Sequence, residues 1–412
     1  LWEAIDSGDF PEWELGIQTF DAEWAAKQPY DVLDATKLIP EEDIPVRIVG
    51  RMVLDRNPDN FFAETEQVAF LPTNVVPGID FSDDPLLQGR LFSYMDTQKS
   101  RLGTTNFHQI PVNAPKCPMH NFQRDGMMQM AVPKGRANYE PNSLDQAGEE
   151  PGPRATDQGF ATYKDMTDLG NQPDEKLRVR ADLFGDHYSQ ARLFYRSQTE
   201  VEQTHIADAI TFELSKVGLG HVIQRVLGHL RVIDEDLAET VAEGLAEDLP
   251  DAATPMREPI DMAPSDALSI MKQAKHSLKG RKVGILIGDG GDQAKVDALR
   301  DAVEAQGGTV MLIAKERGKA EAQLAGSPSV LFDAVALVIG AEDAAKLAKF
   351  KPAVDFVSDA FAHLKAIGAD DASAKLLAAA GVQPDNGVTK LDPAAFVEAA
   401  AQRFYDREAK VW

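Results

Sequence analysis

The last third of the chain has the most regular pattern of hydrophobic and polar positions. Continuous apolar runs, which suit buried strands, alternate with stretches in which apolar residues recur every three or four positions, as on one face of a helix. The runs predict strands at Lys282–Asp289, Thr309–Ala314, Ala334–Gly340 and Ala366–Gly368. The periodic stretches predict helices at Gln293–Gly307, Ala344–Leu364 with a break near Pro352, Ala372–Ala380 and Asp392–Glu408. Strands and helices that alternate in this way indicate a parallel sheet covered by helices on both faces.

Helical periodicity also fills residues 199–246. Thr199, followed three positions later by Glu202, predicts a capping box at the first helix. Three apolar faces follow, carried by Ile206, Ile210, Leu214 and Val217, by Val222, Ile223, Val226, Leu227 and Leu230, and by Leu237, Val241 and Leu245. These faces predict three packed helices. Three histidines also lie on these helices, where packing or solvent contact is the default role: His205, His221 and His229.

A boundary separates these helices from the periodic last third. Prolines at positions 250, 255, 259 and 264 interrupt any helix. From Arg231 to Asp261 the chain carries ten acidic side chains and two basic ones. Because like charges repel one another, this composition predicts a solvated linker over residues 247–279.

Residues 82–103 predict one helix with an unusual polar face. Asp84 suits the N-cap, Pro85 the first helical position and Gly103 a left-handed end. At 3.6 residues per turn, one side of this helix carries Leu87, Arg90, Leu91, Tyr94, Gln98 and Arg101. A guanidinium therefore lies one turn before a phenol. A nearby cation favours the deprotonated phenol oxygen, which is a hard anionic donor suited to ferric iron. A surface Arg/Tyr pair packed on an apolar helix is the alternative interpretation.

The remaining stretches are less regular. Residues 44–54 predict a strand with a bulge or bend at Gly50. Residues 102–153 have little periodicity and many proline, asparagine and glycine residues. His108, Cys117 and His120 lie there without the C-x-x-C or H-x-x-x-H spacing of a metal site, so they are interpreted as loop side chains.

Composition argues against several classes of function. A formal net charge of −24, with no basic stripe, argues against a nucleic-acid partner. The single cysteine excludes an internal disulfide framework and suits a reducing compartment. No run of 18 apolar residues predicts a membrane span, and no signal peptide is evident. These features predict a cytoplasmic protein, although a chain that opens with Leu1 rather than methionine leaves targeting signals open.

The residues around Tyr94 carry a specific resemblance. The string RLFSYMDTQ (Arg90–Gln98) resembles the proximal haem signature of the monofunctional haem catalases at every defined position. Flanking strings that also match are Asp55–Phe70, Pro77–Arg90, Pro111–Gly126, Asn138–Ser143 and Gly185–Ile206. The resemblance covers about residues 1–245. The parallel-sheet region resembles the flavodoxin-like C-terminal domain of large-subunit catalases, which looks like the class I amidotransferase-like group.

The resemblance implies a haem enzyme that disproportionates hydrogen peroxide to water and dioxygen. Tyr94 is then the fifth ligand of the iron, because tyrosine is the proximal ligand in this family. Arg90 is the cation that hydrogen-bonds the tyrosine oxygen, Arg101 pairs with a haem propionate, and Leu87 and Gln98 contact the haem. The expected cofactor is haem b or a modified d form. NADPH is not expected, because large-subunit relatives generally use the extra domain where smaller ones bind it.

The resemblance also implies an α+β fold class and a division into five segments. Residues 1–101 would be the C-terminal part of a catalase β-barrel with the proximal haem helix, followed by a wrapping segment (102–160), a helical domain (161–246), a linker (247–279) and an α/β flavodoxin-like domain with a parallel sheet (280–412). Because the wrapping segment threads between subunits in the family, a homotetramer is expected.

Part of the implied site has no match in this chain. In the family, a distal histidine that transfers protons and an asparagine that orients peroxide precede the region matched here. None of the eight histidines has that context, so the chain is expected to supply the proximal half alone. A barrel without its first strands cannot close. The N-terminal catalase portion is therefore expected in the same assembly, as a separate chain or as a part cut away after folding.

Other interpretations compete with this one. A non-catalytic C-terminal catalase fragment with a stabilising or chaperone-like role would carry the same motifs without turnover. A hydrolase in the parallel-sheet domain would need a nucleophilic cysteine at a strand-to-helix elbow, and Ile367–Asp371 holds none. A phosphate cradle at Gly288–Gly291 would need a third glycine at position 293, which is Gln293.

Overall fold

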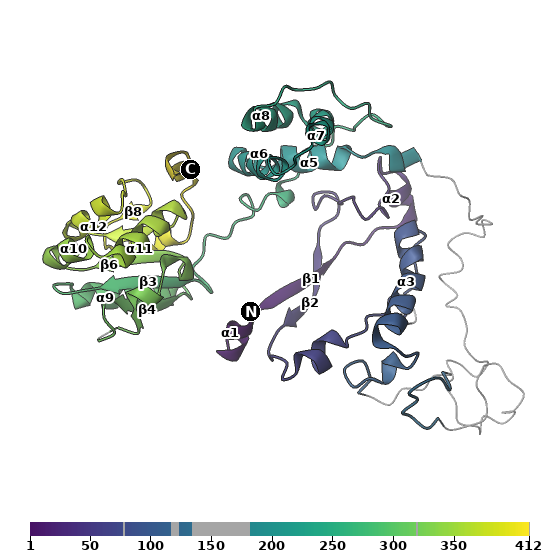
Figure 1. The fold of residues 1–412 in the computed structure, drawn as a ribbon, viewed down its shortest axis with the longest axis horizontal. Helices are drawn as coiled ribbons and strands as arrows, with labels where there is room; N and C mark the ends of the chain where they lie inside the picture. The colour runs from purple at the N-terminus through teal and green to yellow at the C-terminus, as the bar shows by residue number, and fades with distance from the viewer. Residues whose placement is uncertain (77–78, 117–122, 134–181, 319, 412) are drawn as a thin grey trace, which may run out of the picture. The chain divides into compact units, whose positions relative to one another are not determined.

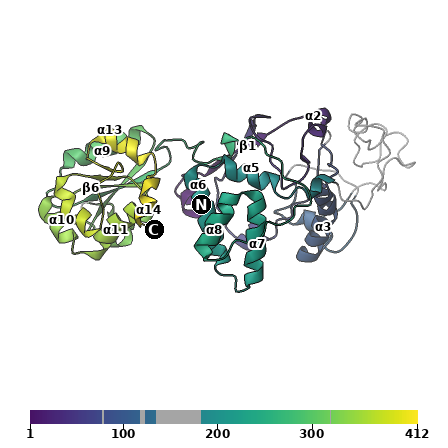
Figure 2. The ribbon, with the colours of Figure 1, turned by 90° about the horizontal axis from the view of Figure 1, so that it is seen from above.

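The computed structural model describes residues 1–76, 79–116, 123–133, 182–318 and 320–411. The chain forms two compact units, Leu1–Ser269 and Ile270–Trp412 (Figures 1 and 2). Cys117, His120 and the Asn138–Ser143 string lie outside the described residues, as does much of the expected wrapping segment. Within the described ranges, no helix is both long and apolar enough to cross a membrane.

The second unit is built on a parallel sheet of six strands in the order β5-β4-β3-β6-β7-β8. The strands are β3 (Lys282–Ile287), β4 (Thr309–Ala314), β5 (Ala322–Gln323), β6 (Ala334–Val338), β7 (Ile367–Ala369) and β8 (Val388–Thr389). The helices are α9 (Gln293–Ala305), α10 (Ala341–Leu347), α11 (Lys351–Ala362), α12 (Ala374–Ala379), α13 (Pro393–Ala400) and α14 (Glu408–Val411).

Helices cover both faces of this sheet (Figure 2), and a separate apolar core lies on each face. On one face, Leu286 and Leu337 pack with Phe356 of α11 and with residues of α10 and α12. On the other face, Ile285 packs with Phe396 of α13 and with residues of α9. The prediction of a parallel sheet with helices on both faces is confirmed.

Some predicted elements of the second unit differ from the structure. The break expected near Pro352 is confirmed: the stretch forms two helices, α10 and α11, and Pro352 lies in the first turn of α11, where its missing N–H is not needed. The helix expected over 392–408 stops at Ala400, since the chain then turns back toward the sheet. Strands β5 and β8 have two residues each and are too short to show a pattern.

A buried charged cluster holds the last turns of the second unit. The side chain of Arg407 has no exposed surface. It donates hydrogen bonds to both carboxylate oxygens of Asp385 at 2.6 and 2.7 Å and to the carbonyl oxygen of Lys365 at 2.6 Å. Its guanidinium carbon lies 4.4 and 4.9 Å from the ring centres of Phe361 and Phe404. Burial raises the pKa of Asp385, but the hydrogen bonds and charge of Arg407 outweigh burial and hold that pKa below its ordinary value.

The helical part of the first unit contains α5 (Ser189–Ser197), α6 (Glu200–Leu214), α7 (Gly220–Ile233) and α8 (Glu235–Leu245). Their apolar faces meet at a core that includes Leu227, Leu237 and Val241. Thr199 and Glu202 form the predicted capping box, which is therefore confirmed.

The acidic, proline-rich segment after α8 is bound to α5 instead of being solvated throughout. Asp261 accepts hydrogen bonds from Arg192 and Arg196 at 2.8 and 2.9 Å, and these cations lower its pKa. The Ser197 hydroxyl oxygen accepts the backbone N–H of Ser265 at 2.9 Å. The expectation of a self-repelling linker therefore does not hold around Asp261, because this carboxylate is paired with arginines 69 and 65 positions upstream.

The first unit begins with α1 (Trp2–Asp6), α2 (Ala22–Ala26) and a small antiparallel sheet of β1 (Glu12–Ile17) and β2 (Arg47–Val53). The register shifts between Leu15 and Gly16, which leaves Val49 as an extra residue beside Gly50. The predicted strand and its irregularity are therefore confirmed. Five large apolar side chains of this sheet are between 44% and 60% exposed: Trp13, Leu15, Ile48, Val49 and Met52.

Helix α3 (Pro85–Leu102) begins and ends as predicted (Figure 1). The Asp84 carboxylate accepts the N–H of Leu87 at 2.9 Å, and Gly103 ends the helix with a φ of +74°. Before α3, a π-helical turn at Phe62–Glu66 leads into irregular backbone, and after α3 a 3-10 turn spans Phe107–Gln109.

Candidate functional site

Helix α3 brings Arg90 and Tyr94 into contact. Nη2 of Arg90 donates a hydrogen bond to the Tyr94 hydroxyl oxygen at 3.2 Å, and the guanidinium carbon lies 4.9 Å from the centre of the tyrosine ring. A spacing of four residues places both side chains on one helix face, which they share with the half-buried Leu87. Tyr94 is half-buried and Arg90 is exposed. This pair therefore places a phenol oxygen and a guanidinium side by side on one face of the helix.

Two other predicted residues of this face, Gln98 and Arg101, bind backbone groups. Gln98 is 6% exposed, and its amide nitrogen donates to the carbonyl oxygen of Phe70 at 3.0 Å. Its amide oxygen accepts a hydrogen bond from Arg101. Arg101 also donates to the carbonyl oxygens of Glu66 and Val68. The structure therefore brings Gln98 and Arg101 together on one stretch of irregular backbone.

The sequence did not single out Asn113, which binds the same stretch. Its side-chain oxygen accepts the N–H of Ala69 at 2.8 Å, and its side-chain nitrogen donates to the carbonyl oxygen of Gln67 at 2.9 Å. Asn113 lies in a loop without helical or strand periodicity, so its position in the sequence does not predict which groups it contacts. Only the need of an irregular segment for hydrogen-bond partners could have pointed to this residue.

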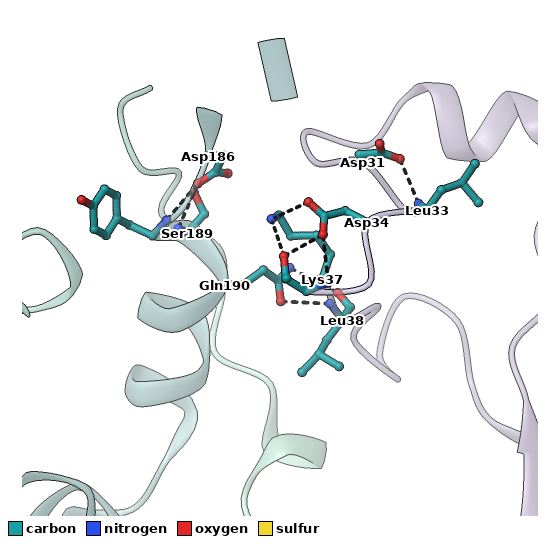
Figure 3. Close-up of polar contacts among 10 residues, drawn as sticks. Asp31, Leu33, Asp34, Lys37, Leu38, Asp186, Ser189 and Gln190 are labelled. Atoms are coloured by element: carbon teal, nitrogen blue, oxygen red, sulfur yellow. Dashed lines mark hydrogen bonds and ion pairs between the residues drawn. The ribbon is translucent and has the colours of Figure 1, made fainter. Parts of the chain in front are cut away.

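A cleft of about 510 Å³ lies elsewhere in the first unit, between residues 34–38 and 184–194 (Figure 3). Inside it, Nζ of Lys37 forms an ion pair with Asp34 at 3.1 Å. Burial raises the pKa of Asp34, but hydrogen bonds from Thr36 and Lys37 outweigh it and lower that pKa. The only lysine of the lining is thus already paired with a carboxylate.

Hydrogen bonds fix the two walls of this cleft (Figure 3). The side-chain amide of Gln190 accepts the N–H of Leu38 at 3.1 Å and donates to its carbonyl oxygen at 3.3 Å. Asp186 is 1% exposed and accepts the Ser189 hydroxyl at 2.6 Å. No motif in the sequence pointed to this cleft, because its two walls are about 150 positions apart.

In the second unit, a carboxylate closes the glycine-rich turn after β3. Asp343 of α10 accepts the N–H of Asp289 at 3.1 Å, and a Cβ on Gly288 would lie 1.9 Å from the same carboxylate. A phosphate at this turn would meet a negative charge, so the geometry disfavours a phosphate cradle. After β7, Asp370 forms an ion pair with Lys295 at 2.8 Å, at the place where a nucleophile elbow would fall.

The described ranges contain no group of three or more histidine, cysteine, aspartate or glutamate side chains arranged to hold a metal ion.

Family models match three separate parts of the chain. A catalase model matches residues 1–146, a model described as catalase-related immune-responsive matches residues 181–245, and a model of the C-terminal domain found in long catalases matches residues 279–408.

Individual relatives are similar over nearly the whole chain. Catalase C of Rhizobium meliloti is 49% identical over 433 residues, which cover 100% of this chain and 60% of the relative. Catalase HPII of Pseudomonas putida is 45% identical over 99% of this chain and 59% of its own length. Catalase-2 of Bacillus subtilis is 41% identical over 99% of this chain and 60% of its own length. The chain therefore spans about 60% of the length of these relatives.

Proposed function

Because this chain belongs to the catalase family and carries the C-terminal domain found in long catalases, we propose that it forms the proximal side of a haem site at which hydrogen peroxide is converted to water and dioxygen. Tyr94 is the iron ligand in this proposal, and Arg90 is the cation that donates a hydrogen bond to its oxygen. The observation that carries the proposal is the 3.2 Å hydrogen bond from Arg90 to the Tyr94 oxygen.

The residues on this face of α3 suit an anionic porphyrin. The face carries two arginines, one half-buried tyrosine, two half-buried leucines, one buried glutamine and no acidic side chain. When bound, haem would supply the redox-active iron, whose oxidised states an anionic axial oxygen stabilises. Leu87 and Gln98 would flank the porphyrin.

Arg101 is proposed to contact a haem propionate while it holds the protein backbone. A guanidinium has five N–H donors, and Arg101 makes three hydrogen bonds to Glu66, Val68 and Gln98. Its side chain is exposed. The remaining donors would therefore be available to an anion beside the helix.

The proposed activity is that of a whole enzyme, of which this chain spans about 60% by comparison with its relatives. We infer that the distal histidine and asparagine lie in the remaining part, and that the assembly is a homotetramer with haem b or haem d. The exposed apolar side chains of β1 and β2 support further burial in such an assembly. Native mass spectrometry of the purified enzyme tests this; a haem-loaded, active monomer would contradict the tetramer.

A non-catalytic stabilising fragment is not favoured. That alternative gives no role to the Arg90–Tyr94 pair, and the similar proteins that cover this chain from end to end are named catalases.

The Tyr94→Phe variant tests the proposal directly. We expect the full-length haem enzyme to lose most of its haem absorbance and at least about a hundredfold of its oxygen evolution, because the anionic ligand is removed. Absorption spectra and an oxygen electrode measure both quantities. Tyr188→Phe is the matched control, since it removes one hydrogen bond, to His229 at 2.8 Å, away from α3.

The proposal fails if Tyr94→Phe keeps the wild-type spectrum and turnover. It also fails if Tyr188→Phe causes an equal loss, because the effect would then follow from any lost phenol group.

A further inference from the structure

The backbone just before α3 is held by side chains. Residues 67–70 form no strand and follow the π-helical turn at Phe62–Glu66. Arg101 binds the carbonyl oxygens of residues 66 and 68, Gln98 binds that of Phe70, and Asn113 binds that of Gln67. Asn113 also accepts the N–H of Ala69. We call residues 66–70 the proximal segment.

Asn113 is well suited to hold the proximal segment. Its side-chain nitrogen makes a second bond, to the carbonyl oxygen of Phe107 at 3.1 Å, so one amide satisfies three backbone groups. Its own backbone N–H is fixed by the carbonyl oxygen of Ile110 at 2.8 Å. An amide is required, because the three bonds need one acceptor and two donors on a short side chain.

Apolar packing contributes little to the placement of α3 among the described residues. Gln98 is the one buried residue of this helix, every residue of which the structure describes, and it is polar. Its bond to Phe70 lies one helical turn after Tyr94. The rotation of the helix about its axis, and with it the direction of the Tyr94 oxygen, therefore depends on where the proximal segment is held.

We propose that Asn113 is a positioning residue for the haem-ligand helix: it fixes the proximal segment, which fixes α3 through Gln98 and Arg101. This inference rests on the proposed role of Tyr94 as the iron ligand. Groups that orient a metal ligand typically change affinity or activity by about 10–100-fold when they are removed. Asn113 acts one contact further away, so we expect about a tenfold effect.

The test uses Asn113→Asp and Asn113→Ala in the haem-loaded, full-length enzyme. Asn113→Asp keeps the shape and the acceptor but loses both donors, which separates hydrogen bonding from packing. The matched control is Gln109→Ala. Gln109 lies in the same loop and accepts the N–H groups of Met130 and Ala131 at 2.7 and 2.9 Å, which belong to a different segment.

Three quantities are measured for each variant: the melting temperature, the absorption and electron paramagnetic resonance spectra of the ferric haem, and oxygen evolution per haem. We expect similar losses of melting temperature for Asn113→Ala and Gln109→Ala. Only the Asn113 variants should shift the ferric spectra and lower turnover per haem about tenfold. If neither Asn113 variant accumulates, Asn113→Gln, which keeps the amide but displaces it by one methylene from the carbonyl oxygens of Gln67 and Phe107, should give the same spectral shift.

Two results would overturn the inference. Either the Asn113 variants keep wild-type spectra and turnover per haem, or Gln109→Ala changes both to the same extent. The Tyr94→Phe variant separates this failure from that of the proposed function. If Tyr94→Phe leaves the spectra unchanged, both proposals fail; if it alters them and the Asn113 variants do not, the positioning role alone is wrong.

Discussion

The second unit and the region around α3 are stabilised in different ways. In the second unit, Val283, Ile285 and Leu337 are completely buried between a sheet and its helices. Within the described part of residues 1–133, Tyr30 is the one buried hydrophobic residue, whereas Phe92 on α3 is 77% exposed. The α3 region is held by hydrogen bonds from side chains to irregular backbone.

This difference determines what a substitution does in each region. Stabilisation by apolar burial depends on the area removed from water and not on the direction of any one bond. Truncation of a buried side chain therefore lowers the free energy of unfolding in proportion to the size of the group removed. A few directional hydrogen bonds contribute less stability but determine where particular atoms lie. We therefore expect core substitutions in the second unit to affect unfolding and substitutions near α3 to affect turnover.

The largest expected effect is that of Phe396→Ala. Phe396 is completely buried against β7, so its truncation should lower the free energy of unfolding of the second unit by about 3–5 kcal/mol. Denaturant unfolding measures this, with Leu331→Ala, at a 55% exposed position, as a control expected to stay within about 0.5 kcal/mol. Turnover per haem should not change. A loss of haem in Phe396→Ala at low denaturant would show that the two regions are not independent.

Arg90→Leu should give the next largest effect, on turnover instead of stability. It removes the cation that donates to the Tyr94 oxygen, so oxygen evolution per haem should fall about 10–100-fold while the unfolding midpoint changes little. Arg90→Lys keeps a positive charge and should lose less. Equal losses in both variants would mean that the geometry of the guanidinium, and not its charge, supports the ligand.

The smallest expected effect is the pH dependence of the Asp385–Arg407 pair. The pKa of Asp385 is lowered in the folded state. The pair therefore stabilises fully above the unfolded value of about 3.9, and this contribution is lost as the pH falls through the lower folded value.

The Asp385→Asn variant tests this dependence. The free energy of unfolding of this variant should fall furthest below that of the wild type at pH 7, and the difference should shrink below about pH 4. Urea midpoints at pH 7 and pH 3 measure the deficit. The control variant Asp355→Asn breaks an exposed ion pair with Lys351. Its free energy of unfolding should differ little from that of the wild type at both pH 7 and pH 3. A deficit in Asp385→Asn that stays constant with pH would contradict the assignment.

Elements stabilised by apolar burial were easier to predict from the sequence than those held by hydrogen bonds between distant residues. Lys282–Ile287 and Gln293–Ala305 were predictable because burial on one or two faces imposes a period on the residues. The two-residue strand β8 was not, since it pairs only through its neighbour β7. The attachment of Asp261 to Arg192 depends on residues far apart in sequence, which local charge patterns do not reveal.

The candidate site was predictable only in part. The spacing of Arg90 and Tyr94 gives their contact directly, because residues four apart meet on a helix. The spacing also placed Gln98 on that face, but not its burial or its bond to Phe70. Asn113 bonds the backbone N–H of Ala69 and the backbone carbonyl of Gln67, which lie 44 and 46 positions away. Every residue type has these backbone groups, so the sequence does not indicate such bonds.

The buried guanidinium of Arg407 has a consequence for synthesis on the ribosome. Asp385 and the whole sheet are translated before Arg407, so the Asp385 carboxylate of the nascent second unit lacks its arginine partner and keeps the N–H of Gly387. The three hydrogen bonds of Arg407 can form only after residue 407 leaves the exit tunnel. A premature stop codon just upstream of it would remove few residues, yet the product would remain open and would be a substrate for quality-control proteases.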